Sequence, residues 1–215
     1  MVEDSRELLR SAWLLHQQGN LDQAERQYRA ILRESPNDPD ALHFFGILRA
    51  QRGSLDAAAE LIGRAVELAP DNANAHYNRG NVLRGLNRRE EALMSYDRAV
   101  AGLPEHVGAW TNRGAVLQEL RRPQEALISF DRALGLDPNH ITALYNRGNA
   151  LRDLGRPEDA GIFATSTYDW RLTHRSGHER LPWSPRPSIT MHACSQNETV
   201  IPNVRIAVAD GNEAY

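Results

Sequence analysis

The chain has 215 residues; 25 arginines and no lysine stand against 28 aspartates and glutamates, a formal net charge of −3 at pH 7. The lack of lysine excludes mechanisms that need its amine, such as Schiff-base chemistry, and the charge balance does not favour nucleic-acid binding. No run approaches the roughly 18 apolar residues that a membrane span needs.

The N-terminal segment and the cysteine usage bear on where the protein works. Residues 1–7 mix charges and lead directly into an amphipathic pattern, so we expect no secretory or transit peptide. A single cysteine, Cys194, excludes an internal disulfide framework and favours a reducing compartment. We therefore expect a cytoplasmic protein.

A period of 34 residues runs through most of the chain. The tripeptide Asn-Arg-Gly occurs at 78–80, 112–114 and 146–148, and single prolines and alanines keep the same spacing. Such a period predicts one helical hairpin that has been copied and stacked on itself. We expect a repeat array over residues 1–170, and its copies span about 5–38, 39–72, 73–106, 107–140 and 141–170.

Each copy predicts two short amphipathic helices joined by a tight turn. The first copy is the weakest, with Ala12 where later copies hold glycine. In the third copy, apolar residues at three- and four-residue steps predict helices near 74–86 and 90–101. The turn slot favours a positive φ, which is cheapest for glycine and next for asparagine. It holds Gly19, Gly53, Asn87, Arg121 and Gly155. Arg121 therefore predicts a strained or differently shaped turn.

The ends of the helices and their contacts follow from the same slots. We expect Asp38, Asn72, His106 and His140 to cap the first helices of copies two to five, and the periodic prolines to end the second helices. The glycines of the repeat should face small alanines across each hairpin, so that the two helices approach closely. On the second helices, Asp97-Arg98 and Asp131-Arg132 predict exposed ion pairs.

The pattern ends before the chain does. The fifth copy stops matching after Ala160, and residues 171–215 carry scattered proline, serine, threonine and asparagine. We expect this tail to be largely unstructured. Residues 204–208 have strand-like composition, but the expected tail offers such a strand no partner.

The repeat resembles that of the tetratricopeptide repeat family. The family pattern, a large residue followed by glycine, leucine, alanine, an aromatic residue, alanine and proline, is matched in the fourth copy by Trp110, Gly114, Leu117, Ala126, Phe130, Ala133 and Pro138. The resemblance covers about residues 5–170. It implies an all-α fold, a right-handed α-solenoid of about five stacked helix-turn-helix hairpins whose first helices line a concave face. Arginines stand where the family usually has leucine, and their stems can cover apolar surface. They are Arg79, Arg113 and Arg147.

The repeated asparagines Asn78, Asn112 and Asn146 are the main candidates for a binding site. The resemblance implies that they lie on the concave face, where an amide can hold both the N–H and the C=O of an extended peptide. The array also resembles that of O-linked N-acetylglucosamine transferases, in which such a series holds the protein substrate. The alternative is that each asparagine bonds a neighbouring helix. Other residues expected on this face, unless it is simply solvated, are His43, Tyr77, Asn81, Arg84, Thr111, Tyr145, Asn149 and Arg152.

No constellation of residues predicts catalysis, a metal site or a cofactor, so we expect a protein that is not an enzyme. The leading hypothesis is a scaffold that binds an extended peptide or a helix of a partner protein, with no nucleic-acid or membrane partner. The first alternative is the substrate-recruiting arm of a bacterial glycosyltransferase, because residues 168–171 resemble the junction to the catalytic part of such proteins. The second is weak self-association through the C-terminal end of the array.

Overall fold

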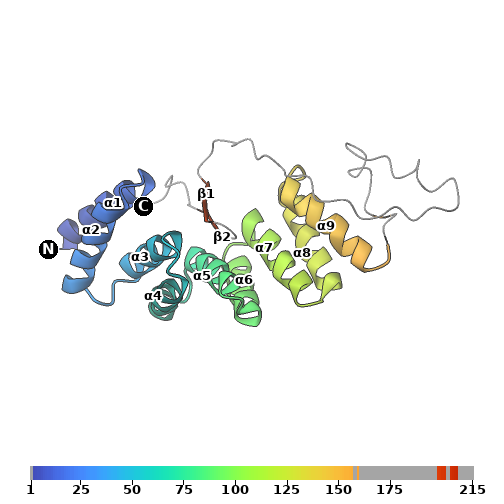
Figure 1. The fold of residues 1–215 in the computed structure, drawn as a ribbon, viewed down its shortest axis with the longest axis horizontal. Helices are drawn as coiled ribbons and strands as arrows, with labels where there is room; N and C mark the ends of the chain where they lie inside the picture. Colours follow the sequence, from blue (N-terminus) through green and yellow to red (C-terminus); the bar gives the residue numbers. More distant parts are fainter. Residues whose placement is uncertain (1, 157–158, 160–197, 202–203, 208–215) are drawn as a thin grey trace, which may run out of the picture.

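The computed structural model describes residues 2–156, 159, 198–201 and 204–207, and these residues form nine α-helices and one pair of β-strands (Figure 1). The helices are α1 (Val2–Gln17), α2 (Leu21–Glu34), α3 (Pro39–Gln51), α4 (Leu55–Leu68), α5 (Ala73–Gly85), α6 (Arg89–Gly102), α7 (Val107–Glu119), α8 (Pro123–Leu136) and α9 (Ile141–Asp153). The strands are β1 (Glu198–Ile201) and β2 (Val204–Ala207).

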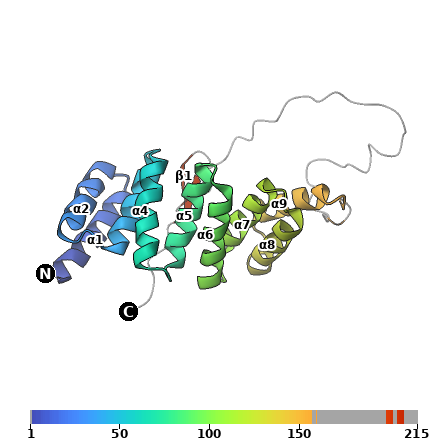
Figure 2. The same ribbon diagram turned by 90° about the horizontal axis from the view of Figure 1, so that it is seen from below.

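The helices stack as antiparallel hairpins. Helices α1–α8 pair as four successive hairpins, and α9 is the first helix of a fifth, whose second helix would fall largely on residues outside the described ones. Among the described helices, successive first helices approach each other more closely than successive second helices do. The array therefore curves with α1, α3, α5, α7 and α9 on its inner side, which we call the first-helix face (Figures 1 and 2). The prediction of an α-solenoid of stacked hairpins is confirmed.

In the turn within each hairpin, the residue at the predicted position has a positive φ. Gly19, Gly53 and Gly155 have φ values of 79°, 79° and 68°, and Asn87 and Arg121 have 63° and 60°. Arg121 thus adopts the conformation of the glycines rather than a different turn. A left-handed conformation costs an ordinary residue about 1–2 kcal/mol, so this turn is strained.

The predicted N-caps of the first helices are confirmed. The side chains of Asp38 and Asn72 accept from the backbone N–H three residues later, at 2.8 Å and 3.0 Å. His106 and His140 do the same through Nδ1, at 3.0 Å and 3.2 Å. A histidine can accept at Nδ1 only when that nitrogen carries no proton, so both imidazoles are neutral in this role.

Aromatic side chains of the second helices explain the repeated glycine. A Cβ atom on Gly80 would lie 2.6 Å from Cε1 of Tyr96, and one on Gly114 would lie 2.5 Å from Cε1 of Phe130. The rings are fully buried in the core of their hairpins. The close neighbour of the glycine is therefore the aromatic ring, and the facing alanine, which we expected to be the reason for glycine, is secondary.

The last described segments form a β-hairpin. β1 and β2 pair antiparallel, with Glu198 opposite Ala207 and Ile201 opposite Val204. The expectation that a strand near residue 204 would lack a partner is wrong, because residues 198–201 supply one. The remaining residues of the expected unstructured tail lie outside the part of the chain that the structure describes.

Candidate functional site

Polar side chains connect successive first helices through contacts that each span 35 residues. His16 bonds Gln51 at 2.7 Å between α1 and α3, His43 bonds Asn78 at 3.0 Å between α3 and α5, and Asn112 donates to Tyr77 at 3.3 Å between α7 and α5. We call these three contacts the polar ladder. The spacing is one repeat plus one residue, because two neighbouring positions of each helix are used. On α5, Asn78 contacts the preceding first helix and Tyr77 contacts the following one.

Asn78 has one hydrogen bond on the ladder and one open position. Its Nδ2, which can only donate, lies 3.0 Å from Nε2 of His43, so that ring nitrogen accepts and the proton lies on Nδ1. Burial lowers the pKa of His43 to about 4, which keeps the ring neutral at pH 7. This neutral ring orients the Asn78 amide, and it fixes the direction in which the amide oxygen points.

The amide oxygen of Asn78 is buried without a hydrogen bond. Asn78 is 3% exposed, and its Oδ1 has no hydrogen-bond partner in the described part of the chain. An unsatisfied buried acceptor costs about 1–3 kcal/mol, so such groups are uncommon and each needs an explanation. Asn78 of α5 therefore holds one oriented, unused acceptor that is buried in this structure.

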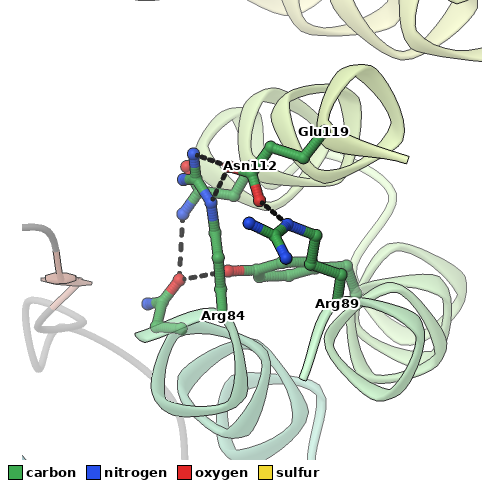
Figure 3. Close-up of polar contacts among 6 residues, drawn as sticks. Arg84, Arg89, Asn112 and Glu119 are labelled. Atoms are coloured by element: carbon green, nitrogen blue, oxygen red, sulfur yellow. Dashed lines mark hydrogen bonds and ion pairs between the residues drawn. The ribbon is translucent and has the colours of Figure 1, made fainter. Parts of the chain in front are cut away.

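Asn112 is used differently, although it occupies the same slot of the repeat. Its Nδ2 donates to Tyr77 and, at 2.9 Å, to Oδ1 of Asn81. Asn81 also accepts from the buried Tyr96 hydroxyl at 2.7 Å, so Asn112, Asn81 and Tyr96 form one chain of hydrogen bonds (Figure 3). Burial raises the pKa of Tyr96, so its hydroxyl stays protonated and donates. Asn112 thus ties α7 to α5, which is the alternative that the sequence left open for these asparagines.

A charged cluster lies beside this network. Arg84 donates from Nε and Nη2 to Oε1 of Glu119, at 2.9 Å and 2.7 Å, and Arg89 donates to Oε2 of the same carboxylate at 3.1 Å (Figure 3). Two arginines of the third hairpin therefore hold one carboxylate of the fourth. Arg84, which we expected to face a ligand, is committed to the contact between hairpins.

The last asparagine of the series is open. Asn146 on α9 is partly buried and makes no side-chain hydrogen bond within the described residues. Asn112, its counterpart one repeat earlier, donates instead to Asn81 at 2.9 Å and to Tyr77 at 3.3 Å. Tyr145, the residue before Asn146, is 70% exposed.

The predicted site residues therefore fall into three groups. The buried ones lie where first helices meet: His43, Tyr77, Asn78, Asn81 and Thr111. Asn112, Asn146, Asn149 and Arg84 are partly buried, and Tyr145 and Arg152 are exposed. Sequence reasoning missed Gln51, Tyr96 and Glu119 as partners of this set. A search for polar pairs at a spacing of 35 residues would have found Gln51 and Glu119.

The arginine of the tripeptide joins three helices. Arg113 on α7 donates to Asp97 of α6 at 2.6 Å and to Ser129 of α8 at 2.7 Å. Arg147 donates to Asp131 at 2.6 Å in the same way. The expected ion pairs within the second helices are thus replaced by pairs with the next hairpin.

No group of three or more histidine, cysteine, aspartate or glutamate side chains in the described part of the chain is placed to hold a metal ion. Of the helices that the structure describes, none combines the length and apolar character needed to cross a membrane.

The fold and the contacts between its hairpins define an α-solenoid of helical repeats. The profile of the tetratricopeptide repeat matches residues 9–73, 45–105, 77–141 and 117–168. Because these matches cover most of the sequence, the chain belongs to the tetratricopeptide repeat family.

Solved structures share this fold at low sequence identity. MamA is 22% identical over 74% of this chain and 87% of its own, with a TM-score of 0.68. YrrB, described as a TPR protein with an unusual peptide-binding site, is 25% identical over 72% of this chain and 79% of its own, with a TM-score of 0.66. PilF of Pseudomonas aeruginosa is 23% identical over 74% and 73%, with a TM-score of 0.65. No curated protein matches the sequence.

Proposed function

We propose that this chain is a protein-interaction scaffold whose first-helix face holds an extended segment of a partner protein, with Oδ1 of Asn78 accepting a main-chain N–H. The observation that carries the proposal is this buried, oriented and unsatisfied oxygen. The peptide-binding site stated for YrrB, a solved structure of the same fold, supports the same class of ligand.

The chemistry of the face favours recognition of the main chain. An extended segment directs alternate N–H groups to one side, so a single acceptor can bind it without reading a side chain. The surrounding groups, which are neutral His43, Tyr77 and Asn81, add no net charge. Binding should therefore depend weakly on salt, and the cost of ordering the segment should keep the affinity modest.

A peptide-display selection on the full chain tests this function. Peptides selected on the wild type should bind Asn78→Ala about tenfold more weakly, since one hydrogen bond to a buried group is worth about 1–1.5 kcal/mol. Met94→Ala is the matched control, because Met94 is 67% exposed on α6, a second helix. Both variants should keep the circular dichroism of the wild type. Peptides that bind all three proteins equally would refute the role of Asn78.

The two alternative functions that the sequence suggested, a glycosyltransferase arm and self-association, remain predictions. Residues 168–171, which suggested the recruiting arm of a glycosyltransferase, lie outside the described residues. For self-association, the observation that bears on it is the exposure of Ile141 and Tyr145 on α9, at 81% and 70%. Light scattering over a range of concentrations tests that alternative, and a transferase assay that shows no turnover would agree with a chain that is not an enzyme.

A further inference from the structure

The C-terminal β-hairpin lies on the first-helix face. Cα atoms of β2 approach those of α5 to within 8 Å, and Cα atoms of β1 approach those of α3 (Figures 1 and 2). These are the two helices that carry Asn78 and His43. A segment from the far end of the sequence thus lies over the part of the array where the unused acceptor is found.

We propose that strands β1 and β2, residues 198–201 and 204–207, are an internal ligand of the first-helix face over α3 and α5, and that an external peptide must displace this strand pair in order to bind. The placement of the hairpin stands on its own contacts; the competition with an external peptide rests on the proposed function.

Equivalent positions of the repeat differ where the hairpin lies. Asn78 and Asn81 on α5 are buried, at 3% and 4% exposure. Asn112 on α7 occupies the same slot as Asn78, and Asn149 on α9 the same slot as Asn81, but both are only partly buried. The residue type and the helix position are the same within each pair. Of the two pairs, only Asn78 and Asn112 compare helices that have a described helix on each side, and of these two helices α5 is the one near β2.

The physical properties of a short hairpin also favour docking. Two strands of four residues each are at best marginally stable alone in water, so the pair needs a surface to pack against. Its two outer edges carry main-chain groups that the pairing of β1 with β2 leaves free. The hairpin makes no hydrogen bond to Oδ1 of Asn78, so it occupies the face through the approach of its strands to α3 and α5 and not through this acceptor.

Attachment in the same chain sets the strength of the competition. A tethered segment acts at an effective concentration on the order of millimolar, so even weak docking keeps the face occupied. The apparent affinity of an external ligand equals its intrinsic affinity multiplied by the fraction of molecules in which the hairpin is undocked. An occupancy of roughly 90–99% would weaken an external peptide by about 10- to 100-fold.

The first test uses a fluorescent synthetic peptide of residues 197–208 and the full chain. Thr199 and Ile206 face each other in the hairpin, and Thr199→Pro with Ile206→Pro removes main-chain donors from both strands. We expect this double variant to bind the peptide at least tenfold more tightly than the wild type in fluorescence anisotropy, because its face is open. The matched control, Thr199→Ser with Ile206→Val, keeps both strands and should bind as the wild type does. Equal affinities for the proline variant and the wild type, or no binding to either, would overturn the proposal.

The second test locates the peptide. Hydrogen exchange of the proline variant should slow in α3 and α5 when the peptide is added and stay unchanged in α9. Asn78→Ala and Met94→Ala in the same background should both leave the affinity for this peptide unchanged, since Oδ1 of Asn78 makes no hydrogen bond to the docked hairpin. Protection confined to other helices would overturn the internal-ligand proposal even if the Asn78 variant failed to fold.

The two proposals can fail separately. If the peptide of residues 197–208 binds the opened variant but the selection yields no external ligand, only the proposed function fails. If selected peptides bind the wild type and the proline variant with the same affinity, only the internal ligand fails.

Discussion

Acid should destabilise the array through His43, and the size of the effect follows from its burial. The ring is neutral and accepts from Asn78 in the folded chain, and burial lowers its pKa from 6.5 to about 4. Because the folded-state pKa lies below the unfolded one, the contribution of His43 to stability is complete above pH 6.5 and is lost as the pH falls toward 4. Integrating the two pKa values gives a loss of about 2 kcal/mol between about pH 7.5 and pH 5.

The matched variant is His43→Tyr, since Tyr77 fills the same slot one repeat later and its hydroxyl accepts from Asn112. A tyrosine at position 43 can therefore accept from Asn78 without titrating in this range. Burial also lowers the pKa of other histidines, so the wild type should lose more than the contribution of His43 alone; they are His16, His76 and His106. Comparing each protein with itself at the two pH values removes any constant change in packing.

Urea unfolding followed by circular dichroism measures this difference. We expect the free energy of unfolding of the wild type to fall by about 2 kcal/mol more than that of His43→Tyr over this pH interval. If both proteins lose the same stability, His43 is not held neutral by burial, and the orientation that we assign to the Asn78 amide is wrong.

Three further substitutions test the packing of the repeat, all by urea unfolding. Arg121→Gly should raise stability by about 1 kcal/mol, because glycine adopts the left-handed turn without strain; a loss would show that the arginine is not strained. Gly80→Ala should cost about 1–3 kcal/mol through its clash with Tyr96. Gly148→Ala, whose new Cβ has no described atom within 4 Å, should be neutral or stabilising, and similar losses at both sites would exclude the ring as the cause. Asn72→Ala should cost about 0.5–2 kcal/mol by removing the cap of α5, and Asn72→Asp, which keeps an acceptor, should restore most of it.

The features that could be predicted from the sequence are those that obey local rules. The period, the left-handed turn at Asn87 and the caps at Asn72 and His106 each depend on a few neighbouring residues, and these predictions are confirmed. The roles of the asparagines depend on the preceding repeat. Asn78 meets a histidine, whereas Asn112 meets a tyrosine and a second asparagine, so one slot has two different environments.

The position of the C-terminal hairpin could not be predicted for a different reason. Strand composition at residues 198–201 and 204–207 was available in the sequence, and an antiparallel pair could have been proposed from it. Its docking on α3 and α5 has no periodic signal, because it joins the end of the chain to two units of the array. The repeat pattern describes only contacts between neighbouring units.

Contacts at a spacing of 35 residues also determine how the array can be shortened or rearranged. The second and third units present acceptors, His43 and Tyr77, to the unit after them, whereas His16 of the first unit donates to Gln51. An exchange of units is therefore tolerated wherever the new neighbours form a compatible pair. Removing residues 73–106 would bring Asn112 next to His43, which is the pair that His43 already makes with Asn78. The same deletion would leave Glu119 without Arg84 and Arg89. Rearranged units can therefore keep a hydrogen bond at the asparagine position. The ion pairs of Glu119 need Arg84 and Arg89 of the preceding unit, so this charged contact limits changes in unit order.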